Sequence, residues 1–306
     1  MNASESHATR LGPWRVSPRT LGTLALVSAF LSIGLVAYGV WVRVSGSGLG
    51  CPDWPLCNGS VIPQDRAAAI ESGHRWYAGI TTIIVFLTAF AGFLQRRTLP
   101  RASRVLLAAA GLIVVQALLG AAVVLTGLHS GVRLVHLALA MSLIGLLTVA
   151  GTSLLQGLDP SLRLRRPGWH VLLAGAAVIL LGGSIVASAK SFECAGLPLC
   201  DNNSSTLGTA LHSAHRTLGV LLLGATVFLA AQHYRRGDRS AFAKAAALAA
   251  FLLSAQILVG FTSVALGLPI GLRILHIGLA ATIWCALVAT WNLSSLAMLP
   301  KLPAGR

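Results

Sequence analysis

The sequence has few charged residues and few aromatic ones. Of its 306 residues, 10% are charged and 6% are Phe, Trp or Tyr, whereas 55% are hydrophobic and the mean hydropathy is +0.78. A soluble globular chain carries about 25% charged residues, which it needs to cover a surface that faces water. The composition therefore excludes the soluble and disordered classes and predicts a polytopic membrane protein.

Acidic residues are especially scarce. Eight Asp and Glu stand against 23 Lys and Arg, which gives a formal net charge of +15. In a soluble protein this excess would suggest a nucleic-acid partner. Here most basic residues lie in clusters between apolar runs, as expected for topology determinants that face anionic lipid. We therefore expect membrane lipid and no nucleic acid as a partner.

Long stretches that lack Asp, Glu, Lys and Arg define the expected membrane spans. A helix needs roughly 20 apolar residues to cross a bilayer, and only helices or closed barrels satisfy their backbone in lipid. No strand-like alternation is present. The sequence predicts an all-α integral membrane fold with eight transmembrane helices, the first of them a retained span rather than a signal peptide. The windows are 20–42, 76–95, 105–132, 134–158, 167–189, 217–234, 245–272 and 274–300.

The basic clusters also predict the orientation of the chain. Under the positive-inside rule the clustered side faces the cytoplasm, which places both termini there. The long loops 43–73 and 190–211 then face outward, in a compartment where disulfides persist. The clusters are Arg10/Arg15/Arg19, Arg96/Arg97/Arg101/Arg104, Arg163/Arg165/Arg166, Arg235/Arg236/Arg239/Lys244 and Lys301/Arg306.

The chain contains an internal repeat with an offset of about 140 residues. Pro-Leu-Cys occurs at 55–57 and 198–200, Gln-x-x-x-Gly at 116–120 and 256–260, and Gly-x-Arg-x-x-His at 131–136 and 271–276. Two halves follow, residues 1–158 and 159–306, each with four helices. Because four is even, both halves enter the membrane in the same direction, and we expect a pseudo-two-fold axis along the membrane normal.

Four histidines recur at equivalent positions of the two halves: His74, His136, His215 and His276. Each is expected about one turn inside a helix that runs inward from the outer side, so all four should lie at one depth. Two such imidazoles on neighbouring helices can ligate one heme iron. A single intramembrane His is as often an interhelical hydrogen-bonding group, but duplication at one depth favours heme ligation. Zinc is the alternative metal, although it would need a third ligand.

Arginines accompany these histidines on the expected outer side. Arg75 and Arg216 directly follow a repeated His, and Arg133 and Arg273 lie one helical turn before one. Arginine binds carboxylates in a bidentate manner, so heme propionates are suitable ligands. Snorkelling to lipid phosphate is the alternative.

The halves differ at the position three residues before the first repeated histidine. Glu71 stands there in the first half and His212 in the second. A carboxylate in this place can transfer protons or stabilise a developing cation, or it can favour a helix N-terminus. His212 and the unmatched His129 are candidates for assisting groups, whereas His7, His170 and His233 receive no role.

Four of the five cysteines form two C-x5-C pairs in the expected outer loops: Cys51/Cys57 and Cys194/Cys200. The preferred interpretation is a structural disulfide that closes each loop over its helices. A redox role for the first pair, on the Glu71 side, is the alternative. Cys285 is expected to be a buried core residue.

Taken together, these features resemble the heme A synthase family, the heme O oxidising enzymes of cytochrome oxidase assembly. The resemblance covers about residues 20–295. It rests on eight spans, duplicated halves, two outer Cys pairs and the motifs Glu71-x-x-His74-Arg75, Gly-x-Arg-x-x-His136, His215-Arg216 and Gly-x-Arg-x-x-His276.

The resemblance implies oxidation of the C8 methyl group of heme O to a formyl group, by successive hydroxylations, to give heme A for aa3-type oxidases. It implies that His74 and His136 hold the substrate heme O, that His215 and His276 hold a heme b cofactor, and that Glu71 is the functional acid. It also implies a link to the heme O-producing farnesyltransferase and the terminal oxidase. Two other functions fit the four histidines: a diheme b-type electron-transfer cytochrome, and a heme transporter or chaperone.

Overall fold

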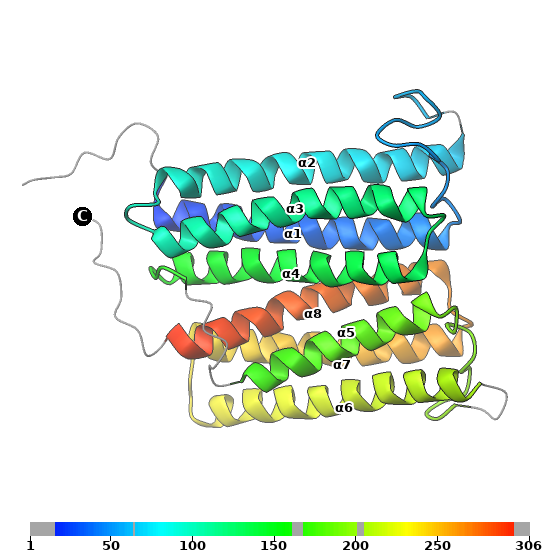
Figure 1. The fold of residues 1–306 in the computed structure, drawn as a ribbon. Coiled ribbons are helices and arrows are strands. Elements are labelled where there is room, and N and C mark those ends of the chain that lie inside the picture. The colour runs from blue at the N-terminus through cyan, green and yellow to red at the C-terminus, as the bar shows by residue number, and fades with distance from the viewer. Residues whose placement is uncertain (1–15, 64, 161–167, 201–204, 297–306) are drawn as a thin grey trace, which may run out of the picture.

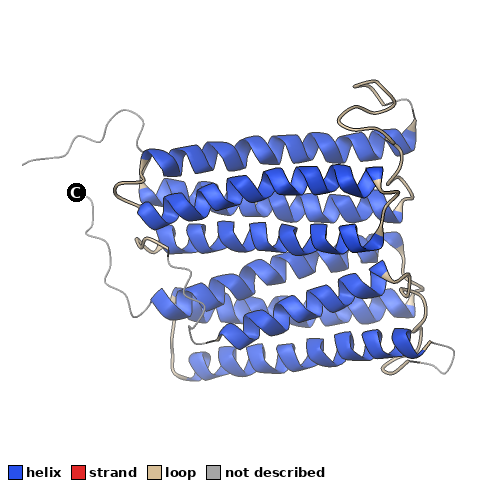
Figure 2. Ribbon diagram, in the orientation of Figure 1, coloured by secondary structure: helices blue, strands red, loops and turns tan. Residues whose placement is uncertain are grey.

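The computed structural model describes residues 16–63, 65–160, 168–200 and 205–296. This part of the chain folds into eight α helices, each long and apolar enough to cross a membrane, and it contains no β strand (Figures 1 and 2). The helices are α1 (Pro18–Val44), α2 (Arg66–Leu94), α3 (Pro100–Leu125), α4 (Ser130–Leu155), α5 (Trp169–Ala187), α6 (Thr206–Arg235), α7 (Ala241–Ala265) and α8 (Ile270–Leu296). The prediction of eight helices is therefore confirmed.

Polar side chains cap the start of four helices. Ser17, Asp65, Ser205 and Ser240 each accept a hydrogen bond from a backbone N–H in the first turn of α1, α2, α6 and α7, at 2.8–3.2 Å. Such a cap satisfies one of the amide donors that has no partner inside the helix. The caps fix helix starts that hydropathy alone does not show.

The predicted windows 76–95 and 217–234 begin too late. α2 and α6 start about ten residues earlier, at Arg66 and Thr206, because charged and polar residues excluded this amphipathic stretch from the windows. The windows 105–132 and 245–272 end too late, because no charged residue marks the turns that follow Leu125 and Ala265. In these turns Gly127 and Gly267 adopt φ of +63° and +72°.

The histidines consequently lie deeper in their helices than predicted. His74 is the ninth residue of α2, and His215 the tenth of α6. At 1.5 Å per residue, each lies more than two turns from its helix start rather than one. His136 and His276 lie six residues after the first residue of α4 and α8.

Helices that are neighbours in sequence pack against one another within α1–α4 and within α5–α8. Contacts between these two groups come from α8 with α1 and α4, and from α5 with α4. The largest buried core lies among α1–α4 and includes Leu21, Leu106, Leu147 and Leu154, which are at most 1% exposed. A smaller core around Leu222, Leu253 and Leu287 lies among α6–α8.

Polar contacts join α4 and α8 across the boundary between the two groups. Asn292 is fully buried, and its amide donates to the hydroxyls of Thr152 and Ser153, both at 2.9 Å. Trp284 donates its indole N–H to the carbonyl of Met141 at 2.7 Å. These hydrogen bonds specify how α8 lies on α4, because apolar packing in lipid gives little preference of its own.

The remaining cysteine, Cys285, is partly buried on α8, and its thiol lies 3.2 Å from the Thr148 hydroxyl on α4.

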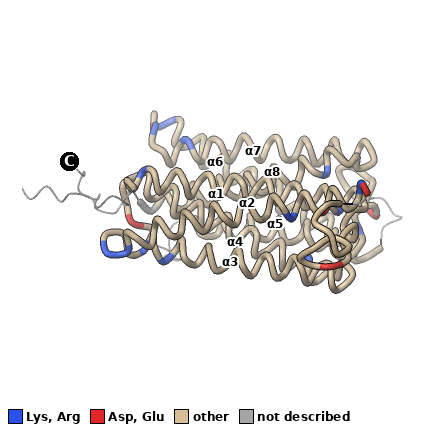
Figure 3. The backbone as a smooth tube through the Cα atoms, turned by 90° about the horizontal axis from the view of Figure 1, so that it is seen from above, with Lys and Arg blue, Asp and Glu red and all other residues tan. Residues whose placement is uncertain are grey.

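Lys and Arg gather toward the two ends of the helices (Figure 3). The predicted basic residues Arg10, Arg15, Arg163, Arg165, Arg166, Lys301 and Arg306, together with His7, lie outside the described residues.

We expect Asn292→Leu to lower the free energy of unfolding by about 1–2 kcal/mol, since it leaves the buried Ser153 hydroxyl and the half-buried Thr152 hydroxyl without their amide donor. The measurement is the melting temperature of the purified protein in detergent, which should fall by a few degrees. Ser142→Ala is the matched control, because exposed Ser142 bonds only to the Ala138 carbonyl of its own helix. Equal melting temperatures for both variants would contradict this role.

Candidate functional site

The repeated histidines all lie toward one end of the bundle, which we call the disulfide end because it carries the disulfides Cys51–Cys57 and Cys194–Cys200. α2, α4, α6 and α8 all begin at this end, and the four histidines lie within their first three turns (Figure 1). They come from two pairs of helices, α2 and α4 in the first half and α6 and α8 in the second. The expected similar depth follows from this common helix direction.

The second-half pair has a geometry that suits a shared iron. The ring centroids of His215 and His276 are 6.4 Å apart, with an angle of 61° between the rings. Two imidazoles that bind one metal from opposite sides have centroids roughly 6 Å apart, since each metal–nitrogen bond is about 2 Å long. The side chains present therefore fit a heme with two axial histidines. In the first half, His136 lies within electrostatic range of His74.

Zinc fits the described residues less well. No three His, Cys, Asp or Glu side chains in the described ranges converge on a point where they could hold a metal ion. A zinc site with three protein ligands is therefore not formed by this part of the chain.

Each repeated histidine faces a glycine on a neighbouring helix. A Cβ built on any of these glycines would lie 3.0–3.8 Å from Cε1 of the histidine ring. At three of the four positions this distance is shorter than an ordinary Cβ contact, so the glycine lets the imidazole pack directly against the neighbouring helix. Gly120 and Gly260 belong to the repeated Gln-x-x-x-Gly motif, so the repeat carried this signal although sequence analysis gave the motif no role. The pairs are Gly39–His74, Gly120–His136, Gly182–His215 and Gly260–His276.

Glu71 lies at the junction between the first disulfide loop and α2. The residue is 4% exposed. One carboxylate oxygen accepts from the Arg75 guanidinium at 2.7 Å, and the other accepts from the backbone N–H of Cys51 at 2.9 Å. Both oxygens are thus held, which fixes the direction of the carboxylate one turn from His74.

Arg75 and Arg216 bind the two disulfide loops in the same way. Arg75 donates to the carbonyls of Cys51, Asp53 and Leu56. Arg216 donates to the carbonyls of Cys194, Gly196 and Pro198 at 2.8–3.0 Å. Their guanidinium groups therefore attach the loops to α2 and α6, and propionate binding by these two residues stays a prediction.

The other two predicted propionate-binding arginines have no acidic partner among the described residues. The Nε of Arg133 is buried without a hydrogen-bond partner. Arg273 lies over the ring of Phe192, 5.7 Å from its centroid. Donors without a partner in an apolar bundle are suited to an anionic ligand.

Both C-x5-C pairs are disulfides in the structure, Cys51–Cys57 and Cys194–Cys200. In the first loop the N–H groups of Gly59 and Asn58 donate to the Asp53 carboxylate, and these bonds hold its pKa below the ordinary value. The loop is thus ordered by hydrogen bonds as well as by its disulfide.

His212 takes the place of Glu71 in the second half. It is buried, and its Nε2 lies 2.9 Å from the Lys190 carbonyl, so it also connects its helix to the preceding loop. His129 precedes α4 and is exposed. His233 pairs with Asp238 beyond the other end of α6. Among the described residues, none of these three histidines forms a hydrogen bond with a repeated histidine.

Two tyrosines near His74 were missed by sequence analysis. The rings of Tyr38 and His74 have centroids 5.6 Å apart, and Tyr77 lies 6.3 Å from Tyr38. The repeat offset of 141 that relates His74 to His215 places Leu218 at the position of Tyr77. The first-half site is therefore more polar than the second at this position, where a phenol replaces an aliphatic side chain. This difference can be read directly from the sequence.

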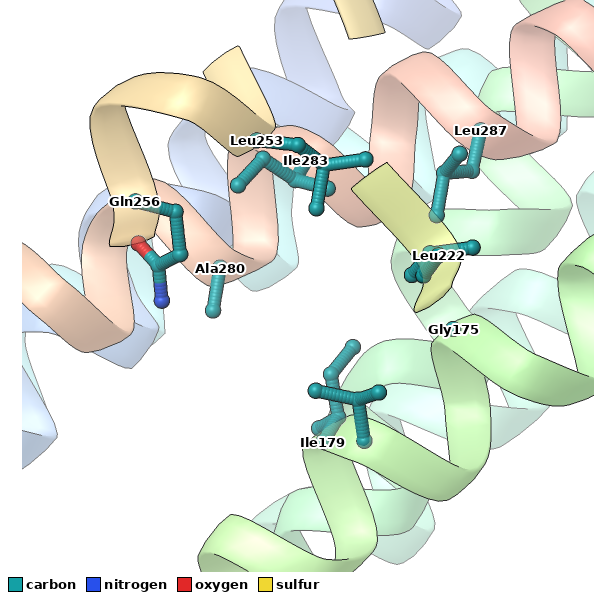
Figure 4. Close-up of a pocket in the computed structure, with 9 residues that line it drawn as sticks. Gly175, Ile179, Leu222, Leu253, Gln256, Ala280, Ile283 and Leu287 are labelled. Atoms are coloured by element: carbon teal, nitrogen blue, oxygen red, sulfur yellow. The ribbon is translucent and has the colours of Figure 1, made fainter. Parts of the chain in front are cut away.

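A small cavity lies inside the second half, among α5–α8 (Figure 4). Of its nine lining residues, only Gln256 has a polar side chain. The other eight, which are Gly175, Val178, Ile179, Leu222, Leu253, Ala280, Ile283 and Leu287, are apolar, and neither His215 nor His276 lines the cavity.

We expect Arg216→Gln to release the second disulfide loop from α6, because an amide cannot replace a guanidinium that serves three carbonyls. Hydrogen exchange followed by mass spectrometry should show faster exchange in peptides covering residues 190–200. Arg235→Gln, at the opposite end of the same helix, is the control and should leave this exchange unchanged. Slow exchange in the Arg216 variant would show that the disulfide alone orders the loop.

Comparison with known proteins adds independent information on this site. A family model described as cytochrome oxidase assembly protein matches residues 22–72 and 64–288. A protein named heme A synthase from Alkalihalophilus pseudofirmus is 30% identical over 216 residues, which cover 65% of this chain and 73% of that protein.

Two further proteins named heme A synthase align over more of the chain. The one from Bacillus pumilus is 26% identical over 275 residues, covering 84% of this chain and 89% of its own length. The one from Symbiobacterium thermophilum is 28% identical over 283 residues, covering 87% and 92%. Because the family model spans both sets of histidine helices and the relatives align along most of their length, the chain belongs to the cytochrome oxidase assembly protein family, together with proteins named heme A synthase.

Proposed function

We propose that the chain is a heme A synthase, which oxidises the C8 methyl group of heme O to a formyl group. The observation that carries this function is the facing pair His215 and His276, whose spacing suits one iron, in a chain of this family. The repeat supplies a second pair, His74 and His136, for a second heme. Two heme sites of unequal polarity suit an enzyme with one cofactor and one substrate of the same chemical class.

The two halves divide this work in our proposal. Residues 159–306 hold heme b between His215 and His276, and residues 1–158 hold heme O between His74 and His136. We further propose that the halves are related by a pseudo-two-fold axis along the membrane normal. The contact between Thr152 and Asn292 supports this axis, since the two positions are 140 residues apart, which is the offset of the repeat.

Heme b, when bound, supplies one-electron transfer that the side chains cannot perform. His215 and His276 would hold its iron, and apolar residues of the same half, such as Ile179 and Ile283, would help to exclude water. Arg273 and Arg133 are placed to bind propionates, one in each half, because neither has an acidic partner among the described residues. Arg75 and Arg216 contribute by holding the disulfide loops over the helices that carry the ligands.

Glu71 is the residue that we assign to the chemistry of the first half. Two successive hydroxylations, each of which adds one oxygen atom and passes two electrons net to an external oxidant, convert the methyl group to –CH2OH and then to –CH(OH)2, and loss of one water leaves the formyl group. A carboxylate with fixed direction stabilises positive charge that develops at this carbon, and it can accept a departing proton. His74 lies one turn further along α2 than Glu71. A substrate heme held by His74 would therefore lie on the same side of the bundle as Glu71.

The disulfide end faces the extracytoplasmic side in our proposal, and both termini are cytoplasmic. The basic clusters at the opposite end support this orientation through the positive-inside rule. The disulfide pairs then serve as structural closures in an oxidising compartment. The lipid-embedded substrate would come from the farnesyltransferase that makes heme O, and the product would pass to the terminal oxidase.

The proposed function predicts that expression of this chain in a host that accumulates heme O produces heme A. Hemes would be extracted with acidic acetone and separated by chromatography, with and without the chain. Purified protein that holds only heme b, in cells whose heme O remains unconverted although respiration is active, would instead indicate the diheme electron-transfer cytochrome.

We expect Glu71→Gln to lower heme A formation by about 100-fold or more, the usual effect of removing a fixed electrostatic group from a reaction site. Heme b content and detergent elution profile should remain those of the unchanged protein. The matched control is His212→Gln at the equivalent position of the second half, which should keep most of the heme A formation. Full activity of the Glu71 variant would remove Glu71 from the chemistry.

A further inference from the structure

Three arginines gather at the disulfide end of the bundle, where α1, α4 and α8 meet. Arg43 of α1 lies within electrostatic range of Arg273 on α8 and of Arg133 on α4, and the stronger effect comes from Arg273. Among the described residues, none of these three side chains forms an ion pair or a hydrogen bond. The only contact given for their guanidinium groups is that of Arg273 with the ring of Phe192.

The packing of the three helices directs these side chains toward one junction. An apolar cluster there brings together Val36 of α1, Ile144 of α4 and Trp284 of α8. Arg43 lies seven residues after Val36, and the arginines of α4 and α8 each lie eleven residues before their member of the cluster. Seven and eleven residues are close to two and three whole helical turns, so each arginine shares a helix face with its cluster residue.

The three arginines also lie at one depth. A Cβ built on Gly278 of α8 would lie 3.4 Å from Cβ of Ala37, so α1 and α8 touch at this point. α1 runs toward the disulfide end and α8 runs away from it. At 1.5 Å per residue, Arg43 and Arg273 both lie roughly 8 Å from this contact on the side of the disulfide end. Arg133 is the repeat equivalent of Arg273 on a helix that runs in the same direction, which places it at the same level.

Three cations this close together need an anion. Like charges repel more strongly in an apolar medium than in water, and buried charges are normally paired. Arg133 and Arg273 each lie one turn from a repeated histidine, on the side of the disulfide end. A heme held by these histidines has two carboxylates on one edge of its porphyrin, and arginine binds a carboxylate through two parallel hydrogen bonds. A lipid phosphate would approach from outside the bundle, whereas Nε of Arg133 is buried.

Arg43 has no counterpart in the second half. The glycines that face the first repeated histidine of each half, Gly39 and Gly182, are 143 residues apart, and the same offset leads from Arg43 to Val186. The cation that α1 contributes is therefore an addition to the repeated frame. It lies across the boundary between the halves, beside Arg273.

We infer that Arg43 of the first half and Arg273 of the second together bind one propionate of the heme in the second half, with Arg133 beside them for a propionate of the first-half heme. The inference rests on the proposed function, which assigns hemes to the repeated histidines. A heme in the second half is then held by residues of both halves. The carboxylate edges of the two hemes meet at the junction of α1, α4 and α8.

The test compares Arg43→Gln with Arg66→Gln in the full-length protein that carries heme b and no heme O. Arg66 is exposed at the start of α2, so the control removes the same charge at the same end of the bundle. We expect Arg43→Gln to speed transfer of heme b to excess apomyoglobin about tenfold, because a charge-assisted hydrogen bond is lost. The control should leave this rate unchanged.

The midpoint potential of heme b is the second measurement. A nearby cation favours the reduced iron, so Arg43→Gln should lower the potential and Arg66→Gln should not. Arg43→Lys keeps the charge and should restore the potential, which a purely structural role of Arg43 would not predict.

Iron protoporphyrin dimethyl ester, loaded in place of heme b, distinguishes a propionate from a lipid phosphate. Its esterified side chains carry no charge, so we expect the unchanged protein and Arg43→Gln to lose this heme at equal rates. A tenfold difference that persists with the diester would overturn the inference and indicate a lipid phosphate as the bound anion.

An unchanged rate and potential in Arg43→Gln would also overturn the inference, and so would an equal effect of Arg66→Gln. Should Arg43→Gln fail to fold, Arg43→Met has an unbranched apolar side chain that suits a helix in lipid, and it is measured and judged in the same way. Heme b is followed without heme O, so failure of the proposed function appears separately, as heme O that the unchanged protein leaves unconverted.

Discussion

The absence of water inside the membrane is the constraint on which the rest of this structure depends. Every backbone polar group must find its partner within the chain, which leaves helices as the spanning elements. The same constraint acts on side chains: Asn292 bonds to hydroxyls across α4 and α8, and Arg216 bonds to the carbonyls of a loop. Atoms that keep no partner, such as Nε of Arg133 and Nδ1 of three repeated histidines, then mark places suited to a ligand.

One helix arrangement, repeated, provides two sites that have diverged in their side chains. Each half places two histidines opposite glycines and attaches a disulfide loop through an arginine. Around this common frame the first half carries Glu71 and Tyr38, whereas the second half carries His212 and an apolar cavity wall. Duplication explains why the halves share their histidines, and the different neighbours are the basis of the proposed division into a cofactor half and a substrate half.

Much of the candidate site could be predicted from the sequence, because repeats and motifs are recognised from residues that are close together in the chain. The two disulfides and the eight apolar helices of the described residues were predicted from spacing and composition and are confirmed, whereas the roles of the four histidines and of Glu71 stay predictions. Helix starts were not, because the windows treated charge as a boundary, whereas Asp65 and Ser205 cap helices that carry charged and polar residues in their first turns. The partners of Arg75 and Arg216 also escaped prediction, since a guanidinium can bind backbone carbonyls as well as a carboxylate, and only folding brings the loop carbonyls within reach.

The sequence by itself determined that this protein is an eight-helix membrane protein with duplicated histidine pairs, because hydropathy and repeat spacing are properties of the chain order. Tertiary structure decided which side chains meet. It placed His215 and His276 with their rings 6.4 Å apart and put the Gln256 amide nitrogen against His276, a contact that Gln116 does not make with His136 among the described residues. Identical motifs acquire different contacts because the orientation of a buried polar side chain depends on neighbours from other helices, which the local sequence does not specify.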